Sequence, residues 1–161
     1  MFYLDLFAAL KKFDVDYLLI GGLAVSLHGV ERATMDVDIT VAMQPENLEG
    51  MLQCAKALQL TPVAPVPLES LTNLALLRQW HTEKNMLAFA LRTQALAGVT
   101  IDILLFPPLD FNEMHTRAVQ FNLGDVSVAV ACVDDLIAMK RAAGRPIDLS
   151  DIEHLEKIKS L

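Results

Sequence analysis

A short apolar run that ends in two adjacent glycines constrains the fold of this chain more than any other feature. The run is Tyr17–Ile20, and the glycines are Gly21 and Gly22. Four apolar residues with no polar face fit a strand that is buried on both sides. Because glycine lacks a Cβ, the chain can turn tightly there, and residues 23–28 have the pattern of a short helix. The sequence therefore predicts a strand, a tight turn and a helix in direct succession.

The rest of the sequence continues this alternation of strand-like and helical patterns. Helices are expected over residues 2–13, 46–60, 68–80, 111–118, 135–143 and after 148, and strands over residues 36–43, 86–91, 100–106, 119–123 and 126–130. Residues 62–67 contain three prolines and are expected to lack regular structure. Asp134 and Asp148 are expected to cap the last two helices, with Gly144 ending the first of them. This order predicts an α+β domain with a mixed β-sheet flanked by helices, and a C-terminal helix pair.

Length and composition fit one globular domain. The chain has 161 residues, of which 53% are apolar, and this is enough for a buried core. We expect a single domain over residues 1–161, with its core at residues 15–131 and its C-terminal helices at residues 133–161.

Charge and apolar patterning disfavour several classes of protein. The formal net charge of −7 disfavours a protein that grips nucleic acid over a broad basic surface, because phosphate neutralisation is the main source of such affinity. No apolar run reaches the roughly twenty residues of a membrane span, and the N-terminus lacks the pattern of an export signal. Cys54 and Cys132 lie far apart without metal-ligand spacing, which is typical of unpaired cysteines in a reducing compartment. We therefore expect a cytoplasmic protein without membrane association.

Three aspartates in strand-like surroundings are the strongest candidates for a functional site. Asp36 and Asp38 stand two residues apart at the start of the strand expected at 36–43, and Asp102 lies in the apolar segment 99–105. Residues two apart on a strand point to the same side of the sheet, so the first two carboxylates are expected to project together. Carboxylates this close raise each other's pKa unless a cation neutralises them. The pattern therefore predicts a divalent-metal site that faces the glycine turn.

Taken in order, these motifs resemble a known superfamily. The glycine pair, the Arg-x-Thr-x-Asp-x-Asp sequence of residues 32–38 and Asp102 resemble the nucleotidyltransferase superfamily that includes DNA polymerase beta. The likeness is closer to the minimal bacterial nucleotidyltransferases related to abortive-infection toxins of the AbiEii type, because residues 140–151 look like their C-terminal motif. The likeness is carried by residues 17–41, 83–106 and 133–155. It implies a nucleotidyltransferase-like mixed sheet.

The resemblance also implies a role for each matched residue. Gly21 and Gly22 would let backbone amides approach the triphosphate of an NTP, and the N-terminus of the following helix would add a favourable dipole. Two Mg²⁺ ions, or Mn²⁺ in their place, would be bound by three carboxylates. The implied metal ligands are Asp36, Asp38 and Asp102, and the implied catalytic residues are these three and Lys140. Phosphate contacts are further implied for Arg32, Thr34, Lys140 and Arg145.

Several of these residues also have a purely structural explanation. The glycine pair serves any tight strand-to-helix turn, and its second glycine stands where many superfamily members carry a serine whose hydroxyl reaches phosphate. Lys140 lies near the expected end of a helix, where the dipole favours cations. The resemblance marks either Asp148 or Asp151 as a further functional carboxylate, but acidic residues are also expected in the first turn of a helix. The sequence does not decide between these two aspartates.

The function that fits these residues best is a Mg²⁺-dependent nucleotidyltransferase that moves an NMP from an NTP to an acceptor hydroxyl and releases pyrophosphate. The acceptor is open among RNA such as tRNA, a protein and a small molecule. One alternative is a catalytically weak binding module that acts as a toxin–antitoxin partner. A mean hydropathy of +0.39 fits an interface with an antitoxin or a second copy of the chain. Another alternative is a metal-dependent phosphodiesterase, since paired carboxylates also support hydrolysis.

Overall fold

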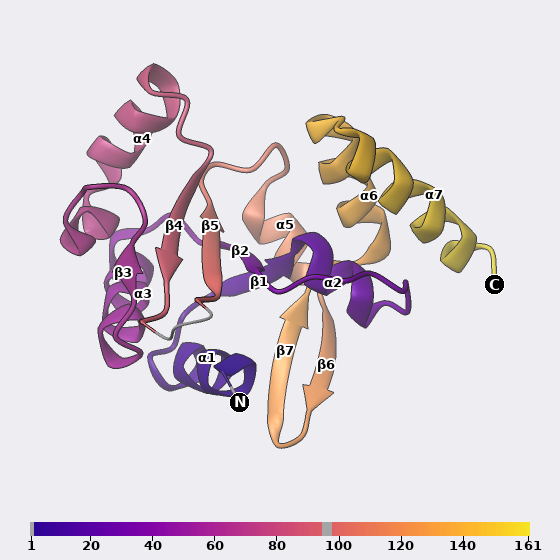
Figure 1. The fold of residues 1–161 in the computed structure, drawn as a ribbon, viewed down its shortest axis with the longest axis horizontal. Coiled ribbons are helices and arrows are strands. Elements are labelled where there is room, and N and C mark those ends of the chain that lie inside the picture. Colours follow the sequence, from indigo (N-terminus) through magenta and orange to yellow (C-terminus); the bar gives the residue numbers. More distant parts are fainter. Residues whose placement is uncertain (1, 95–97) are drawn as a thin grey trace.

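The centre of the molecule is a mixed sheet with the strand order β3-β4-β5-β2-β1-β7-β6 (Figure 1). The structure is a computed structural model, which describes residues 2–94 and 98–161. Its strands are β1 (Tyr17–Ile20), β2 (Val37–Val41), β3 (Thr61–Pro62), β4 (Ala88–Arg92), β5 (Thr100–Leu104), β6 (Val119–Leu123) and β7 (Val126–Val130). Part of the connection between β4 and β5 lies outside the described residues. This sheet confirms the predicted α+β class.

Helices surround the sheet and end in a packed C-terminal pair. They are α1 (Phe2–Lys12), α2 (Gly21–Leu27), α3 (Pro45–Ala57), the 3-10 helix η1 (Leu68–Thr72), α4 (Leu74–Glu83), α5 (Phe111–Thr116), α6 (Val133–Ala143) and α7 (Pro146–Lys159). Figure 1 shows α6 and α7 side by side, while the β6–β7 hairpin extends in another direction from the central strands. None of the helices in the described part of the chain combines the length and the apolar character that a membrane span needs.

Strand register sets the position of the acidic residues. Strand β1 pairs antiparallel with β2, and β2 pairs parallel with β5. All four residues of β1 are buried, as its uniformly apolar sequence predicts. In β2 and β5, the apolar residues that alternate with the aspartates are buried in the core: Val37, Ile39, Ile101 and Ile103. Because side chains alternate along a strand, Asp38 and Asp102 project from the opposite face of these two strands.

Several element boundaries differ from the sequence prediction. Helix α2 begins at Gly21, two residues earlier than expected, so the glycine pair forms the first turn of the helix. The pattern over 68–80 is divided at Asn73, whose side chain accepts a hydrogen bond from Leu76 N–H and starts α4. The first residue of the proline-rich segment, Pro62, belongs to the short strand β3. It is tolerated there because β3 is an edge strand of the described sheet.

Both predicted C-terminal caps are wrong, although the predicted helix end is confirmed. Helix α6 begins at Val133, so Asp134 lies in its first turn. Helix α7 begins at Pro146, and Asp148 is its third residue, which accepts a hydrogen bond from the backbone N–H of Arg145. Proline favours the first position of a helix, and this moves the start of α7 toward the N-terminus. Gly144 ends α6 with φ +67°.

Candidate active site

Asp38 and Asp102 face each other across the β2–β5 ladder. They are register partners in the parallel pair, and their side chains are close enough to shift each other's pKa. Burial raises the pKa of Asp38 to about 6, and the nearby carboxylates of Asp102 and Asp36 add to the rise. Burial also raises the pKa of Asp102, as does the charge of Asp36, while the contact with Asp38 works in the opposite direction. Burial and mutual repulsion therefore make both strand carboxylates harder to ionise than ordinary aspartates.

Asp36 lies beside this pair but does not join it. Strand β2 begins at Val37, so Asp36 stands just before the strand that was expected to include it. Its Oδ1 accepts a hydrogen bond from the backbone N–H of Thr100 at 3.3 Å. Within residues 2–94 and 98–161, no group of three Asp, Glu, His or Cys side chains is arranged to hold a metal ion. The structure thus brings Asp38 and Asp102 together, whereas the third predicted ligand, Asp36, is hydrogen-bonded to β5.

The strand carboxylates fit a divalent cation by their chemistry. Carboxylate oxygens are the ligands that Mg²⁺ prefers in proteins. A cation between Asp38 and Asp102 would remove the repulsion and compensate for the burial that together raise their pKa values. Asp36 is close enough to influence both groups electrostatically, and it would complete a set of three after leaving Thr100. The donor set therefore fits Mg²⁺, with Asp38 and Asp102 as its preassembled part.

The glycine pair is required by the packing around these carboxylates. Ile20, the residue before the pair, is the antiparallel partner of Asp38, which brings the turn directly against the acidic side chain. A Cβ at Gly21 would overlap the carboxylate of Asp38, and the backbone there has φ +71°. A Cβ at Gly22 would lie 3.3 Å from Thr34 Cβ and 3.4 Å from Arg32 Cζ. Both glycines therefore allow the turn to approach groups that the sequence marked as functional.

A cavity of about 210 Å³ opens beside the strand carboxylates. Five charged residues and one glycine line it: Asp38, Asp102, Lys140, Arg145, Asp148 and Gly21. Its apolar lining consists of Ile20, Ala88, Leu104, Leu136, Met139 and Ala143. The remaining predicted site residues do not line it: Gly22, Arg32, Thr34, Asp36 and Asp151. Helix α6 thus forms one wall of the cavity.

Sequence reasoning missed this apolar wall. Helix α6 contributes Leu136, Met139, Lys140 and Ala143 to the cavity, which are spaced as residues on one face of a helix. This helix face could have been found from the sequence, because residues three, four and seven positions apart lie on the same face of a helix. The prediction considered only the lysine of this group.

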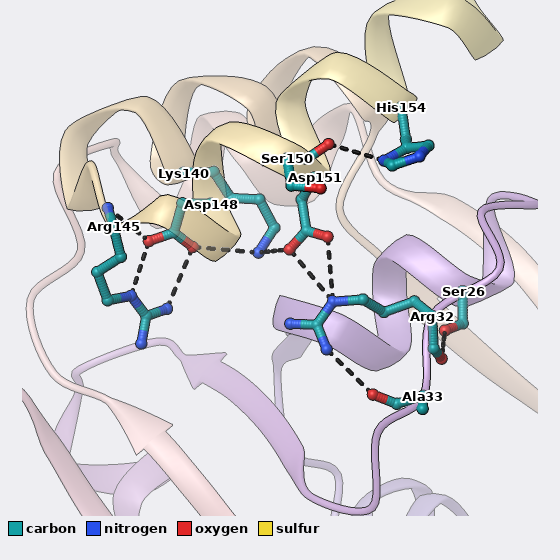
Figure 2. Close-up of polar contacts among 9 residues, drawn as sticks. All are labelled: Ser26, Arg32, Ala33, Lys140, Arg145, Asp148, Ser150, Asp151 and His154. Atoms are coloured by element: carbon teal, nitrogen blue, oxygen red, sulfur yellow. Dashed lines mark hydrogen bonds and ion pairs between the residues drawn. The ribbon is translucent and has the colours of Figure 1, made fainter.

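Three predicted phosphate-binding cations are held by two buried aspartates (Figure 2). Lys140 Nζ lies 2.9 Å from Asp151 Oδ2 and 3.5 Å from Asp148 Oδ1. Arg145 Nε lies 2.7 Å from Asp148 Oδ2. Arg32 Nε lies 3.0 Å from Asp151 Oδ1. The five charged side chains form one chain of ion pairs, in which the two carboxylates are only 1% and 2% exposed whereas Arg145 is 69% exposed.

The electrostatics of Asp148 differ from those of the strand carboxylates. Burial acts to raise the pKa of Asp148, but hydrogen bonds from Arg145 and the charge of Lys140 outweigh it, so its pKa is lowered. The same pairing raises the pKa of Arg145 above its ordinary value. Both groups therefore stay charged at neutral pH.

The loop between α2 and β2 is fixed by side chains from three parts of the chain. Thr34 Oγ1 donates a hydrogen bond to the carbonyl of Asp36 at 3.4 Å. The hydroxyl of Tyr3 in α1 donates to the carbonyl of Met35 at 2.7 Å. Arg32 ties the loop to α7 through Asp151. In this structure, Arg32 and Thr34 therefore orient the loop that leads into the strand carboxylates.

Comparison with known proteins adds two findings. A family described as a nucleotidyltransferase of unknown function (DUF6036) matches residues 2–161. No curated protein matches the sequence. The fold is similar to the crystal structure of an antigenic nucleotidyltransferase-like protein from Paracoccidioides brasiliensis, with a TM-score of 0.58 and 15% identity over 96% of this chain and 73% of that chain. The predicted superfamily and fold are confirmed, while the likeness to AbiEii-type toxins stays a prediction.

Proposed function

The chain belongs to the family of nucleotidyltransferases of unknown function (DUF6036), and from this premise we propose that it transfers an NMP from an NTP to an acceptor hydroxyl. Pyrophosphate is the other product. The observation that supports this function most is the in-register pair of Asp38 and Asp102, which lines one cavity together with Gly21. Two carboxylates with raised pKa values beside a glycine turn suit a reaction between a metal-bound triphosphate and a hydroxyl.

Asp38 and Asp102 would hold Mg²⁺, and Asp36 would join them once it leaves the Thr100 amide. When bound, the metal supplies Lewis-acid stabilisation of the charge on the phosphate oxygens. Asp102 is half-buried, lines the cavity and has a raised pKa, so it is the group suited to accept the proton of the acceptor hydroxyl.

The cations and glycines would bind the triphosphate. Arg145 and Lys140 line the cavity on the side of α6 and α7. Arg32 lies over Gly22, and the absence of side chains at both glycines leaves the backbone open to phosphate oxygens. In the structure these cations are paired with Asp148 and Asp151, so a bound triphosphate would share them with the two aspartates.

The acceptor must present a hydroxyl to Asp102, and RNA, protein and small molecules all satisfy this requirement. We keep one second function, a catalytically weak member that binds a toxin–antitoxin partner. A specific observation favours it, because Asp36 accepts a hydrogen bond from Thr100 and only two of the three predicted carboxylate ligands meet in the described structure. Such a protein would bind NTP and release no pyrophosphate.

Calorimetric titration with ATP, CTP, GTP and UTP, each with and without Mg²⁺, tests the proposed function. We expect Mg²⁺-dependent binding that is lost in the Asp38→Asn and Asp102→Asn variants, and pyrophosphate release when an acceptor is present. Free monophosphate without pyrophosphate would instead indicate a phosphodiesterase. An NTP affinity that changes neither with Mg²⁺ nor with either substitution would contradict the proposed site.

A further inference from the structure

The chain of ion pairs has one buried member that joins three separate parts of the fold. Asp151 lies in α7, its partner Lys140 lies in α6, and its other partner Arg32 lies in the loop before β2. Figure 2 shows both cations converging on this one carboxylate from different directions. A carboxylate that is 2% exposed is costly without counterions. Here the two oxygens bind one cation each at the shortest distances, 3.0 Å to Arg32 and 2.9 Å to Lys140.

The two cations that Asp151 holds lie near different parts of the candidate site. Arg32 lies over Gly22, where its Cζ would be 3.4 Å from a Cβ at that glycine. Lys140 lines the cavity and acts on Asp38, where its charge opposes the rise in pKa. Asp151 itself does not line the cavity, so it influences the site through its partners.

Asp148 makes a different set of contacts, and this decides between the two aspartates. Its strongest interactions are with Arg145, three residues earlier, which donates side-chain hydrogen bonds of 2.7 and 3.1 Å and a backbone one of 3.1 Å. Its distance to Lys140 is 3.5 Å, longer than that of Asp151. Asp148 thus mainly stabilises the start of its own helix, whereas Asp151 joins the helix pair to the loop.

We propose that Asp151 is a positioning residue for nucleotidyl transfer, which holds Arg32 beside Gly22 and Lys140 at the cavity so that both meet the triphosphate. This role rests on the proposed function, because it presupposes that an NTP occupies the cavity. Asp151 acts through the two cations and contacts no reacting atom.

Titration with inorganic tripolyphosphate and Mg²⁺ tests this role without involving a base. The Asp151→Asn variant should bind tripolyphosphate and ATP at least about tenfold more weakly, the cost of disordering a charge-assisted contact. Asp151→Glu keeps the charge and should recover part of the loss. Asp135→Asn is the matched control, because Asp135 is also a buried aspartate that binds an arginine, Arg117, at 2.9 Å, and neither residue lines the cavity. It should lose stability and keep its affinity.

Nitrogen-15 NMR of the unmodified protein covers the case in which Asp151→Asn does not fold. The Nε–H of Arg32, which donates to Asp151, should shift when tripolyphosphate is added. The Nε–H of Arg117, which donates to Asp135, should stay in place in the same spectrum.

The outcomes separate the two proposals. A protein that binds neither tripolyphosphate nor NTP would overturn the proposed function and this inference with it. Binding that leaves the Arg32 signal unmoved, or a folded Asp151→Asn variant with unchanged affinity, would overturn the positioning role alone. Equal weakening by Asp135→Asn would do the same, since it would show that any buried pair on α6 matters as much.

Discussion

The acidic residues on the strands and those on the last helix share one site but have opposite electrostatic surroundings. Burial, together with the carboxylates of Asp102 and Asp36, raises the pKa of Asp38 on β2 to about 6. Asp148, on α7, faces Arg145 and Lys140, and its pKa is lowered. Burial acts to raise both pKa values, so the difference comes from the neighbouring charges, which are mainly carboxylates around Asp38 and cations around Asp148. The comparison teaches that the helix carboxylates are already neutralised by the protein, whereas the strand carboxylates need a cation from outside.

Removing a strand carboxylate should have the largest effect, on activity alone. Asp38→Asn is expected to lower pyrophosphate release by about a thousandfold, because a metal ligand and a group of the reacting pair are lost together. Its free energy of unfolding should not fall, since the substitution removes repulsion. Chemical denaturation and a pyrophosphate assay measure the two effects. Asp134→Asn, at an exposed aspartate on α6, should change neither, and a strong loss of stability in Asp38→Asn would break the comparison.

Removing a helix carboxylate should instead lower stability. Asp148→Asn leaves Arg145 without its carboxylate and Lys140 with Asp151 alone. We expect a loss of about 2 kcal/mol, less than for a fully buried pair because Arg145 is 69% exposed. Glu156→Gln is the control on the same helix, because its pair with Arg141 spans 3.7 Å between largely exposed side chains and should contribute less than about 1 kcal/mol. Urea denaturation of both variants checks the difference. Equal losses would show that burial of the pair has no importance here.

Substitution of Gly21 tests the close packing between the glycine turn and the strand carboxylate of Asp38. Gly21→Ala should cost about 1–2 kcal/mol for the positive φ alone, and more for the overlap with the carboxylate of Asp38. Gly124 in the β6–β7 turn also has a positive φ, and a Cβ there meets nothing within 4 Å. Gly124→Ala therefore isolates the backbone cost. If thermal unfolding shows the same loss for both variants, Gly21 does not pack against Asp38 as described.

The two acidic groups should give opposite pH dependence of stability. The pKa of Asp38 is raised from its ordinary 3.8 to about 6 on folding, so its contribution to stability is lost as pH rises through that interval and is constant above it. The pKa of Asp148 is lowered, so its contribution is present at neutral pH and is lost in acid. Denaturation at several pH values should therefore show that the free energy of unfolding of Asp38→Asn rises relative to that of the wild type as pH increases from about 4 to about 6. A gap that stays constant over this range would contradict the raised pKa.

The smallest expected effect concerns the identity of the base. The side chains that line the cavity in the described part of the chain include no amide, hydroxyl or aromatic group. Strong discrimination requires hydrogen-bonding groups that a wrong substrate leaves unpaired, so the four NTPs should bind within about threefold of one another. Competition titrations measure these ratios. A preference of a hundredfold or more would locate base recognition outside this cavity.

The sequence predicts local features of the fold well because their causes are local. The apolar run 17–20, the hairpin turn at Gly124 and the helix end at Gly144 each depend on a few neighbouring residues. The α7 cap failed because arginine is not a residue that usually caps a helix, so Arg145 was overlooked in favour of Asp148.

The sequence predicted which residues belong to the candidate site, but it did not predict which of them contact each other. Asp38 and Asp102 were marked by their strand surroundings, but their pairing depends on strand register, which joins residues 64 positions apart. The binding of Arg32 by Asp151 joins residues even further apart in the chain. Such contacts come from tertiary packing, which no short motif encodes.

A crystal structure with Mn²⁺ and a non-hydrolysable NTP tests the central claim most directly. We predict an anomalous peak that is coordinated by Asp38 and Asp102, with Asp36 turned toward it and the triphosphate beside the glycine turn. Asp148 and Asp151 should bind no metal, because the cations of the chain already neutralise them. A metal bound by the helix aspartates, or a nucleotide bound with no metal at the strand carboxylates, would contradict the account.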